Sequence, residues 1–220
     1  MNPSRLVRSL SVVVAVAFAV GACSTPAVPI GGGGTPKPTA QSTAARSGCP
    51  TSEPAPLAAG QVRTVEIKTA KGSITIKVEG SLSPIAAGNF VALASCHYYD
   101  GVVFHRLVPG FVIQGGDPDG TGRGGPGYTI GDEPVAATYR RGTVAMARTS
   151  QPHSQGSQFF IVLDDGAASA LAAANTYAIF GTVTAGMDTV DAIAAMPNSG
   201  EPNNAALQPV AMDTLTVSTP

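Results

Sequence analysis

Two polar side chains, Arg106 and Gln114, lie among apolar residues in a stretch whose alternation predicts two short strands. Pro109-Gly110 separates these strands and suits a type II turn, because proline fixes φ at the second position and glycine tolerates a positive φ at the third. Side chains alternate between the faces of a strand. The expected face sets are Phe104 with Arg106 and Val108, Val103 with His105 and Leu107, and Val112 with Gln114. A guanidinium donor and an amide held beside aromatic rings predict a peptide-binding surface.

The same combination of an amide and an aromatic ring recurs in a later predicted strand, residues 157–163. Alternation again assigns the side chains to two faces. The expected sets are Gln158, Phe160 and Val162 on one face, and Phe159, Ile161 and Leu163 on the other. One face of this strand therefore also presents a polar amide next to a ring.

Other residue types that could do chemistry form weaker patterns. His97, His105 and His153 show no metal-ligand spacing, so no metal site is expected, and His105 is expected to support packing. The glycine-rich segment 120–127 contains G-x-G-x-x-G, but Pro126-Gly127 leaves no helix to carry a phosphate. We therefore interpret this segment as a tight surface loop rather than a nucleotide site.

Composition limits the class of protein. A chain of 220 residues suits one domain with appendages, and a hydrophobic content of 44% is enough for a core. The net charge of −1 predicts neither a nucleic-acid partner nor an electrostatic membrane patch.

Short strands and helices must hold these polar side chains beside the aromatic rings. Strands are predicted over 62–68, 73–78, the two arms of the hairpin in 104–117, 142–147, 157–163, 176–183 and 210–217. Ser83-Pro84 predicts the start of a helix that ends near Ser95, and a second helix is expected over 187–195. Residues 164–174 are expected to form an Ala-rich loop that could include a helical turn. About eight short antiparallel strands with polar loops favour a mainly β, closed barrel.

The N-terminal region has the pattern of an export signal. Arg5 and Arg8 precede the apolar run Val12–Val20, which is shorter than the about 20 residues of a membrane-spanning helix. Val20-Gly21-Ala22-Cys23 resembles the lipobox of bacterial lipoproteins, which implies cleavage before Cys23 and lipid attachment to its thiol. The alternative is an ordinary signal peptide with an incidental cysteine.

These features give a domain plan. It consists of a signal peptide over 1–22, a flexible tether rich in Gly, Pro, Ser and Thr over 23–60, and a folded domain over 61–220. The expected location is the extracytoplasmic face of a bacterial cell membrane. Because export permits disulfides, Cys49 and Cys96 either form a bridge or remain two free thiols.

Several ordered motifs share one family resemblance, which extends over roughly residues 60–220. They are Phe104-His105-Arg106, Pro109-Gly110-Phe111, Gln114-Gly115-Gly116-Asp117, Met146-Ala147-Arg148, Gly156-Ser157-Gln158-Phe159-Phe160-Ile161 and Ile179-Phe180-Gly181. Together they resemble a cyclophilin-type peptidyl-prolyl isomerase. The resemblance implies an eight-stranded antiparallel barrel capped by two helices.

The resemblance also implies roles for individual residues. Arg106 is expected to be the catalytic residue. The expected walls of the proline pocket are Phe111, Val112, Phe160 and Leu171, with Tyr177 at the rim. The residues expected to bind the flanking peptide backbone are Gln114, Ala147, Arg148 and Gln158. Since isomerisation makes and breaks no covalent bond, no cofactor or metal is expected.

The resulting expectation is a monomeric, lipid-anchored isomerase that accelerates rotation of X–Pro bonds and assists the folding of exported proteins. Its partners would be proline-containing polypeptides and, through Cys23, the lipid bilayer. One alternative is a chaperone module that binds proline peptides with little turnover. A purely structural lipoprotein, which binds no proline peptide, is a third hypothesis.

Overall fold

The computed structural model describes residues 47–220, so the predicted signal peptide, Cys23 and most of the tether lie outside the described residues. The strands are β1 (Val62–Thr69), β2 (Gly72–Glu79), β3 (Val103–Val108), β4 (Val112–Gly115), β5 (Thr143–Met146), β6 (Phe159–Val162), β7 (Ile179–Ala185), β8 (Ala205–Ala211) and β9 (Thr214–Ser218). The helices are α1 (Pro84–Ser95), α2 (Ala167–Ala174) and α3 (Met187–Ala194). None of the helices in this part of the chain has the length and apolar character needed to cross a membrane.

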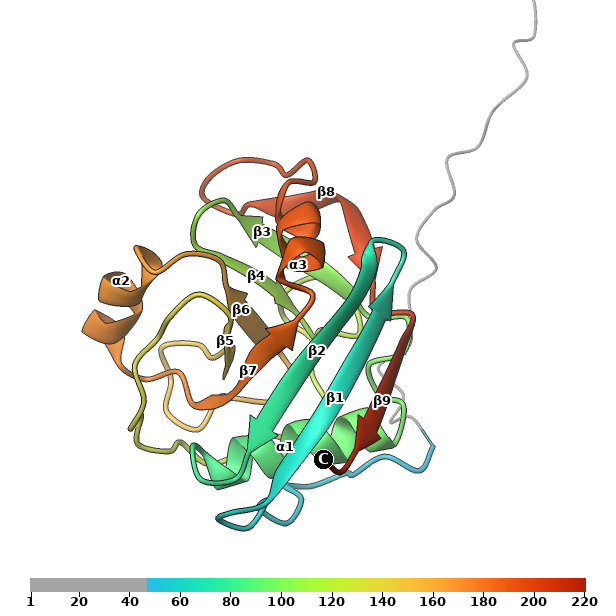
Figure 1. Cartoon of the computed structure of the whole chain (residues 1–220), viewed down its shortest axis with the longest axis vertical. Helices are drawn as coiled ribbons and strands as arrows, with labels where there is room; N and C mark the ends of the chain where they lie inside the picture. The colour runs from blue at the N-terminus through green and yellow to red at the C-terminus, as the bar shows by residue number, and fades with distance from the viewer. Residues whose placement is uncertain (1–46) are drawn as a thin grey trace, which may run out of the picture. The chain divides into compact units, whose positions relative to one another are not determined.

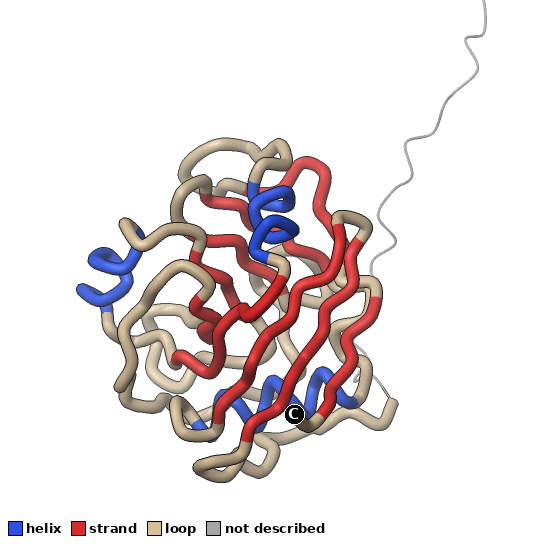
Figure 2. The backbone as a smooth tube through the Cα atoms, in the orientation of Figure 1, coloured by secondary structure: helices blue, strands red, loops and turns tan. Residues whose placement is uncertain are grey.

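The strands form one curled antiparallel sheet in the order β8-β3-β4-β6-β5-β7-β2-β1-β9 (Figures 1 and 2). The expected mainly β antiparallel architecture is therefore confirmed. The sheet is a half-barrel rather than a closed barrel, because β8 and β9 end the order without pairing to each other. It has nine strands rather than eight, and three helices rather than two, in residues 47–220.

The extra strand arises where a single strand was expected over 210–217. The chain pairs with β3 through β8, and Met212 then exchanges backbone hydrogen bonds with Gly101 and Val102. The Asp213 N–H donates to the carbonyl of Lys68, and β9 continues along β1. The chain thus changes partner strand at residues 212–213. The alternation of side chains along a predicted strand does not show that the chain moves from one partner strand to another.

A register shift in β3 overturns one expected face set. Against β4, Phe104 pairs with Gly115 and Arg106 pairs with Gln114, which leaves His105 as an extra residue in β3. The register with β8 also shifts here, but there the extra residues lie on β8. A bulge of this kind reverses the alternation beyond it. Phe104 and Leu107 consequently both pack in the main core, whereas Arg106 is half-buried and faces a cavity on the other side. The expectation that Phe104 and Arg106 share a face is wrong.

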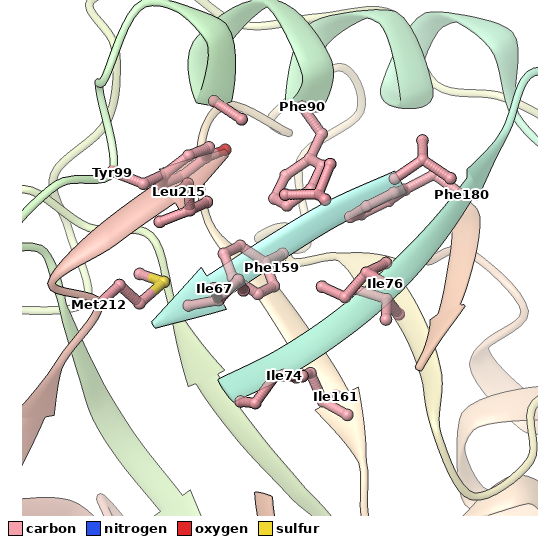
Figure 3. Close-up of a cluster of buried hydrophobic side chains, with 14 of the residues drawn as sticks. Ile67, Ile74, Ile76, Phe90, Tyr99, Phe159, Ile161, Phe180, Met212 and Leu215 are labelled. Carbon is pink, nitrogen blue, oxygen red and sulfur yellow. The ribbon is translucent and has the colours of Figure 1, made fainter. Parts of the chain in front are cut away.

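The main core lies between the sheet and α1 (Figure 3). Phe90 on α1 contacts three aromatic rings at centroid distances of 4.8–5.3 Å. Those rings belong to Tyr99, Phe159 and Phe180. Burial of these large side chains helps to hold α1 against the sheet.

The first turn of α1 is capped from a distant loop. Ser83 and Pro84 occupy the expected positions at the start, but the Ser83 side chain makes no capping hydrogen bond. Instead the Glu133 carboxylate accepts the N–H groups of Ile85 and Ala86, each at 2.8 Å. A carboxylate suits this place because the start of a helix has unpaired N–H groups and a partial positive charge.

Part of the segment expected as tether packs on α1. Cys49 and Cys96 form a disulfide. Leu57 is buried and donates its N–H to the carbonyl of Pro84 at 2.9 Å. The chain passes so close to α1 that a Cβ at Gly88 would collide with the carbonyl oxygen of Ala55.

Candidate active site

A cavity of about 160 Å³ opens on the face of the sheet opposite α1. Its lining consists of Arg106, Phe111, Val112, Gln114, Ala147, Arg148, Phe160, Leu171 and Tyr177. These are all the residues expected from the sequence to act on or bind the peptide, apart from Gln158. Segments separated by more than 60 residues in sequence (Arg106 to Leu171) therefore meet at one site.

Pairing between β4 and β6 places the central side chains. Gln114 pairs with Phe160, and Val112 pairs with Val162, so four side chains lie side by side on one face. Val112, Phe160 and Val162 belong to a small hydrophobic cluster around the cavity, while Ile161 belongs to the main core. The face assignments made for these two strands are confirmed. The Pro109-Gly110 turn is also as expected, because Gly110 has φ +68° and the N–H of Phe111 donates to the carbonyl of Val108 at 3.0 Å.

A chain of hydrogen bonds orients the polar side of the cavity. Nη1 of Arg106 donates to Oε1 of Gln114 at 3.4 Å. Nε2 of Gln114 donates to Oε1 of Gln158 at 2.9 Å, and Nε2 of Gln158 donates to the carbonyl of Gly124 at 2.9 Å. The amides hold the guanidinium at the cavity, and its other N–H groups can reach a bound peptide.

The glycine-rich segment 120–127, whose Gly124 accepts the last of these hydrogen bonds, is itself organised around Asp117. The Asp117 carboxylate accepts N–H groups from Asp119, Thr121 and Arg123 at 2.8–3.0 Å. Burial raises the pKa of Asp117, but these and neighbouring N–H donors, with the Thr121 hydroxyl, outweigh burial and leave the pKa below its ordinary value. The loop is thus folded around a carboxylate. All residues from 118 to 142 are described, and none of them is helical.

Arg148 lines the cavity, but its guanidinium is bonded within the protein. Its Nη2 donates to the carbonyl of Gln151 at 2.8 Å, and its Nε donates to the carbonyl of Thr149 at 3.2 Å. Its Nη1 lies 3.2 Å from the Asp132 carboxylate. These contacts fold the loop that follows Arg148. The guanidinium is thereby engaged within the protein, so we expect its backbone and aliphatic stem, rather than its charge, to meet a peptide.

A second cavity of about 360 Å³ continues from the first. The two share Gln114, Ala147 and Arg148, and Gln158 lies in the second. The remaining walls are Gly122, Arg123, Gly124, Gly125, Pro126, Tyr128, Thr129, Thr149, Ser154, Gly156 and Ser157. Sequence reasoning missed these residues, because a surface loop gives no signal of what it faces. The two cavities together can take a ring in the first and the adjoining peptide residues in the second.

Aromatic contacts complete the apolar wall. The ring of Tyr177 stands edge-on to Phe160, with centroids 5.3 Å apart and planes at 86°. The buried side chain of Leu171 reaches the cavity from α2, the helix that stands at one side of the sheet (Figure 1). His105 does not line the cavity; burial lowers the pKa of its imidazole, outweighing the opposite effect of Asp117. Residues 47–220 contain no cluster of three or more metal-binding side chains.

The family model for the cyclophilin type peptidyl-prolyl cis-trans isomerases matches residues 64–217 of this chain. A peptidyl-prolyl cis-trans isomerase of Acinetobacter baylyi is 40% identical over 159 residues, covering 66% of this chain and 80% of the relative. A probable peptidyl-prolyl cis-trans isomerase A of Mycobacterium leprae is 39% identical over 177 residues, covering 72% and 93% of the two chains.

Solved structures give the same likeness. A Cryptosporidium parvum cyclophilin type peptidyl-prolyl cis-trans isomerase superposes with a TM-score of 0.64 and 30% identity, covering 72% of this chain and 99% of that chain. The structure of the same parasite protein in the presence of the dipeptide Ala-Pro gives a TM-score of 0.63 and 32% identity, covering 71% and 99%.

Proposed function

This chain belongs to the cyclophilin-type peptidyl-prolyl cis-trans isomerase family, and from that premise we propose that it isomerises X–Pro bonds of exported proteins at the outer face of a bacterial cell membrane. The isomerase activity follows from family membership. The proposal adds the residues that act, the substrate position and the membrane anchor.

The observation that carries the catalytic part is the meeting of Arg106 with Phe111 and Phe160 at one cavity. A peptide C–N bond resists rotation with a barrier of about 18–20 kcal/mol, because resonance keeps it planar. In the twisted geometry the proline nitrogen becomes a hydrogen-bond acceptor. Arg106 is a permanently charged donor that can bind this nitrogen or the adjacent carbonyl more strongly in the twisted state than in the planar one.

The strength of a charged hydrogen bond indicates how much of the rate acceleration Arg106 can supply. A hydrogen bond to a charged group contributes roughly 1.5–3 kcal/mol. At about 1.4 kcal/mol per factor of ten, this corresponds to one to two decades in rate. The remainder is assigned to holding the proline ring between the apolar walls while the preceding carbonyl turns, and to removing water from the amide.

The substrate proposal is a proline ring in the 160 Å³ cavity with the adjoining peptide residues in the 360 Å³ cavity. The parasite relative whose structure was solved in the presence of Ala-Pro supports a proline-containing ligand in this family. A test is the exchange between cis and trans signals of a proline peptide, followed by NMR with catalytic amounts of the protein. Faster exchange is expected; binding without faster exchange would favour the chaperone alternative.

The anchor proposal rests on the sequence Val20-Gly21-Ala22-Cys23 after an apolar run, which lies outside the described residues. A lipid on Cys23 with two or three acyl chains would hold the protein stably at the membrane. We expect mass spectrometry of the mature protein to find an acylated Cys23 at its N-terminus. Cys23→Ser is the matched control and is expected in the soluble fraction. An unmodified Cys23 in soluble wild-type protein would contradict the anchor and leave the isomerase activity untouched.

A further inference from the structure

We propose that Tyr139 is a positioning residue for the proline cavity, because its buried hydroxyl holds the backbone of Tyr177 against Phe160. This role rests on the isomerase activity at this cavity. Tyr139 does not line the cavity, and no sequence motif singled it out.

The contact is a clamp made by one hydroxyl group. The Tyr139 hydroxyl donates to the carbonyl of Tyr177 at 2.9 Å, and its oxygen accepts the N–H of Tyr177 at 3.3 Å. Tyr139 is 1% exposed. Burial raises the pKa of Tyr139 despite the opposing effect of the bond to Tyr177, so the hydroxyl stays protonated and keeps both roles at neutral pH.

The segment that carries Tyr177 has few other supports. Residues 172–176 are exposed, between the buried Leu171 and β7. The helix α2 ends at Ala174, and the capping residue Asn175 has a left-handed φ of 43° and donates its N–H to the carbonyl of Leu171. Among the described residues, the hydrogen bonds that reach 172–177 from outside α2 are the two from Tyr139.

The clamp therefore fixes the rim of the cavity. Tyr177 is held directly, with its ring edge-on to Phe160 at 5.3 Å. The Tyr177 ring would contact the proline ring equally in the planar and twisted states. Loosening Tyr177 should weaken peptide binding more than it slows rotation, which raises KM and leaves kcat nearly constant.

Tyr139→Phe removes only the hydroxyl, and Thr143→Val is its matched control. Thr143 is also buried, its hydroxyl accepts the N–H of Arg140 at 2.9 Å in the neighbouring turn, and it does not line the cavity. For a proline peptide, Tyr139→Phe is expected to raise KM about three- to tenfold and to change kcat less than about twofold. Thr143→Val is expected to lower the melting temperature without changing KM. An unchanged KM in Tyr139→Phe would overturn the proposal.

A double-mutant cycle tests the route through Tyr177. In a Tyr177→Ala background, Tyr139→Phe is expected to have no further effect on KM. The same rise in KM in both backgrounds would overturn the proposal, because Tyr139 would then act through another group.

Hydrogen exchange in the unaltered protein gives an independent measurement, valid even if Tyr139→Phe does not fold. The Tyr177 amide should be protected although the exposed amides just before it exchange fast, and a fast Tyr177 amide would overturn the clamp. An inactive wild-type protein with a protected Tyr177 amide would contradict the proposed function and retain the clamp.

Discussion

Phe159 and Phe160 are neighbours on β6 that belong to two different regions. Phe159 is 0% exposed and packs in the main core. Its aromatic partners are Phe90, Tyr99 and Phe104, at centroid distances of 5.2, 5.7 and 6.2 Å. Phe160 is 4% exposed, contacts the ring of Tyr177 and borders the 160 Å³ cavity.

The difference shows how one strand serves two purposes. The core side of β6 is filled by protein rings, whereas the opposite side keeps a space that a proline ring can fill. Stability and activity should therefore be separable between adjacent positions.

Phe159→Ala should give the largest effect on stability. Truncating a fully enclosed ring leaves a cavity among three aromatic partners, and such changes cost about 3–5 kcal/mol. Urea denaturation measures the loss. The fraction that remains folded should isomerise peptides at nearly the wild-type rate. A loss below about 1 kcal/mol would contradict the assignment of Phe159 to stability and Phe160 to activity.

Phe160→Ala should lower the activity more than the stability. One side of the ring already faces the cavity, so we expect a loss of about 1–3 kcal/mol in the free energy of unfolding. Because the proline ring loses its main apolar wall, kcat/KM should fall at least about tenfold. Peptide kinetics on the folded variant measure this. Wild-type kinetics would show that the cavity is not the proline site.

Asp117 holds the glycine-rich loop beside the 360 Å³ cavity, and its contribution to stability should depend on pH. Its folded-state pKa lies below its ordinary value of 3.8, so its contribution to stability is complete above that value and is lost as pH falls through the lowered pKa. Asp117→Asn should cost about 1–3 kcal/mol at neutral pH. Thermal unfolding at a series of acidic pH values should show the difference from wild type shrinking below pH 3.8. A difference independent of pH would contradict the role assigned to the carboxylate.

Removing the Glu133 carboxylate, which caps the core helix α1, should give the smallest loss of stability. Glu133→Ala removes the acceptor of two N–H groups at the start of α1 and should cost about 1–2 kcal/mol. Glu133→Gln keeps one acceptor oxygen and should lie between Ala and wild type. Thermal unfolding of the two variants measures this order, and equal stabilities of all three proteins would exclude the cap.

The sequence was sufficient wherever local alternation decides the outcome. The faces of β4 and β6 follow from side-chain period alone, which is why Gln114 and Phe160 were placed correctly. The motifs of a known family supplied the remaining cavity residues, including Leu171 and Tyr177.

The features that sequence reasoning missed depend on partners far along the chain. The bulge in β3 is defined only by its pairing with β4. The cap on α1 comes from Glu133, and the clamp on Tyr177 comes from Tyr139. No periodicity or local motif connects such positions, because each contact depends on how separate segments pack.

The most direct test of the account is the exchange rate of a proline peptide with wild type, Arg106→Lys and Arg106→Ala. Arg106 lies in the cavity with one hydrogen bond to Gln114, so its removal should leave the fold intact. We predict that Arg106→Ala lowers kcat/KM by about 10- to 100-fold, with Arg106→Lys between it and wild type and all three melting temperatures similar. Equal rates for Arg106→Ala and wild type would contradict the claim that a fixed cation stabilises the twisted amide.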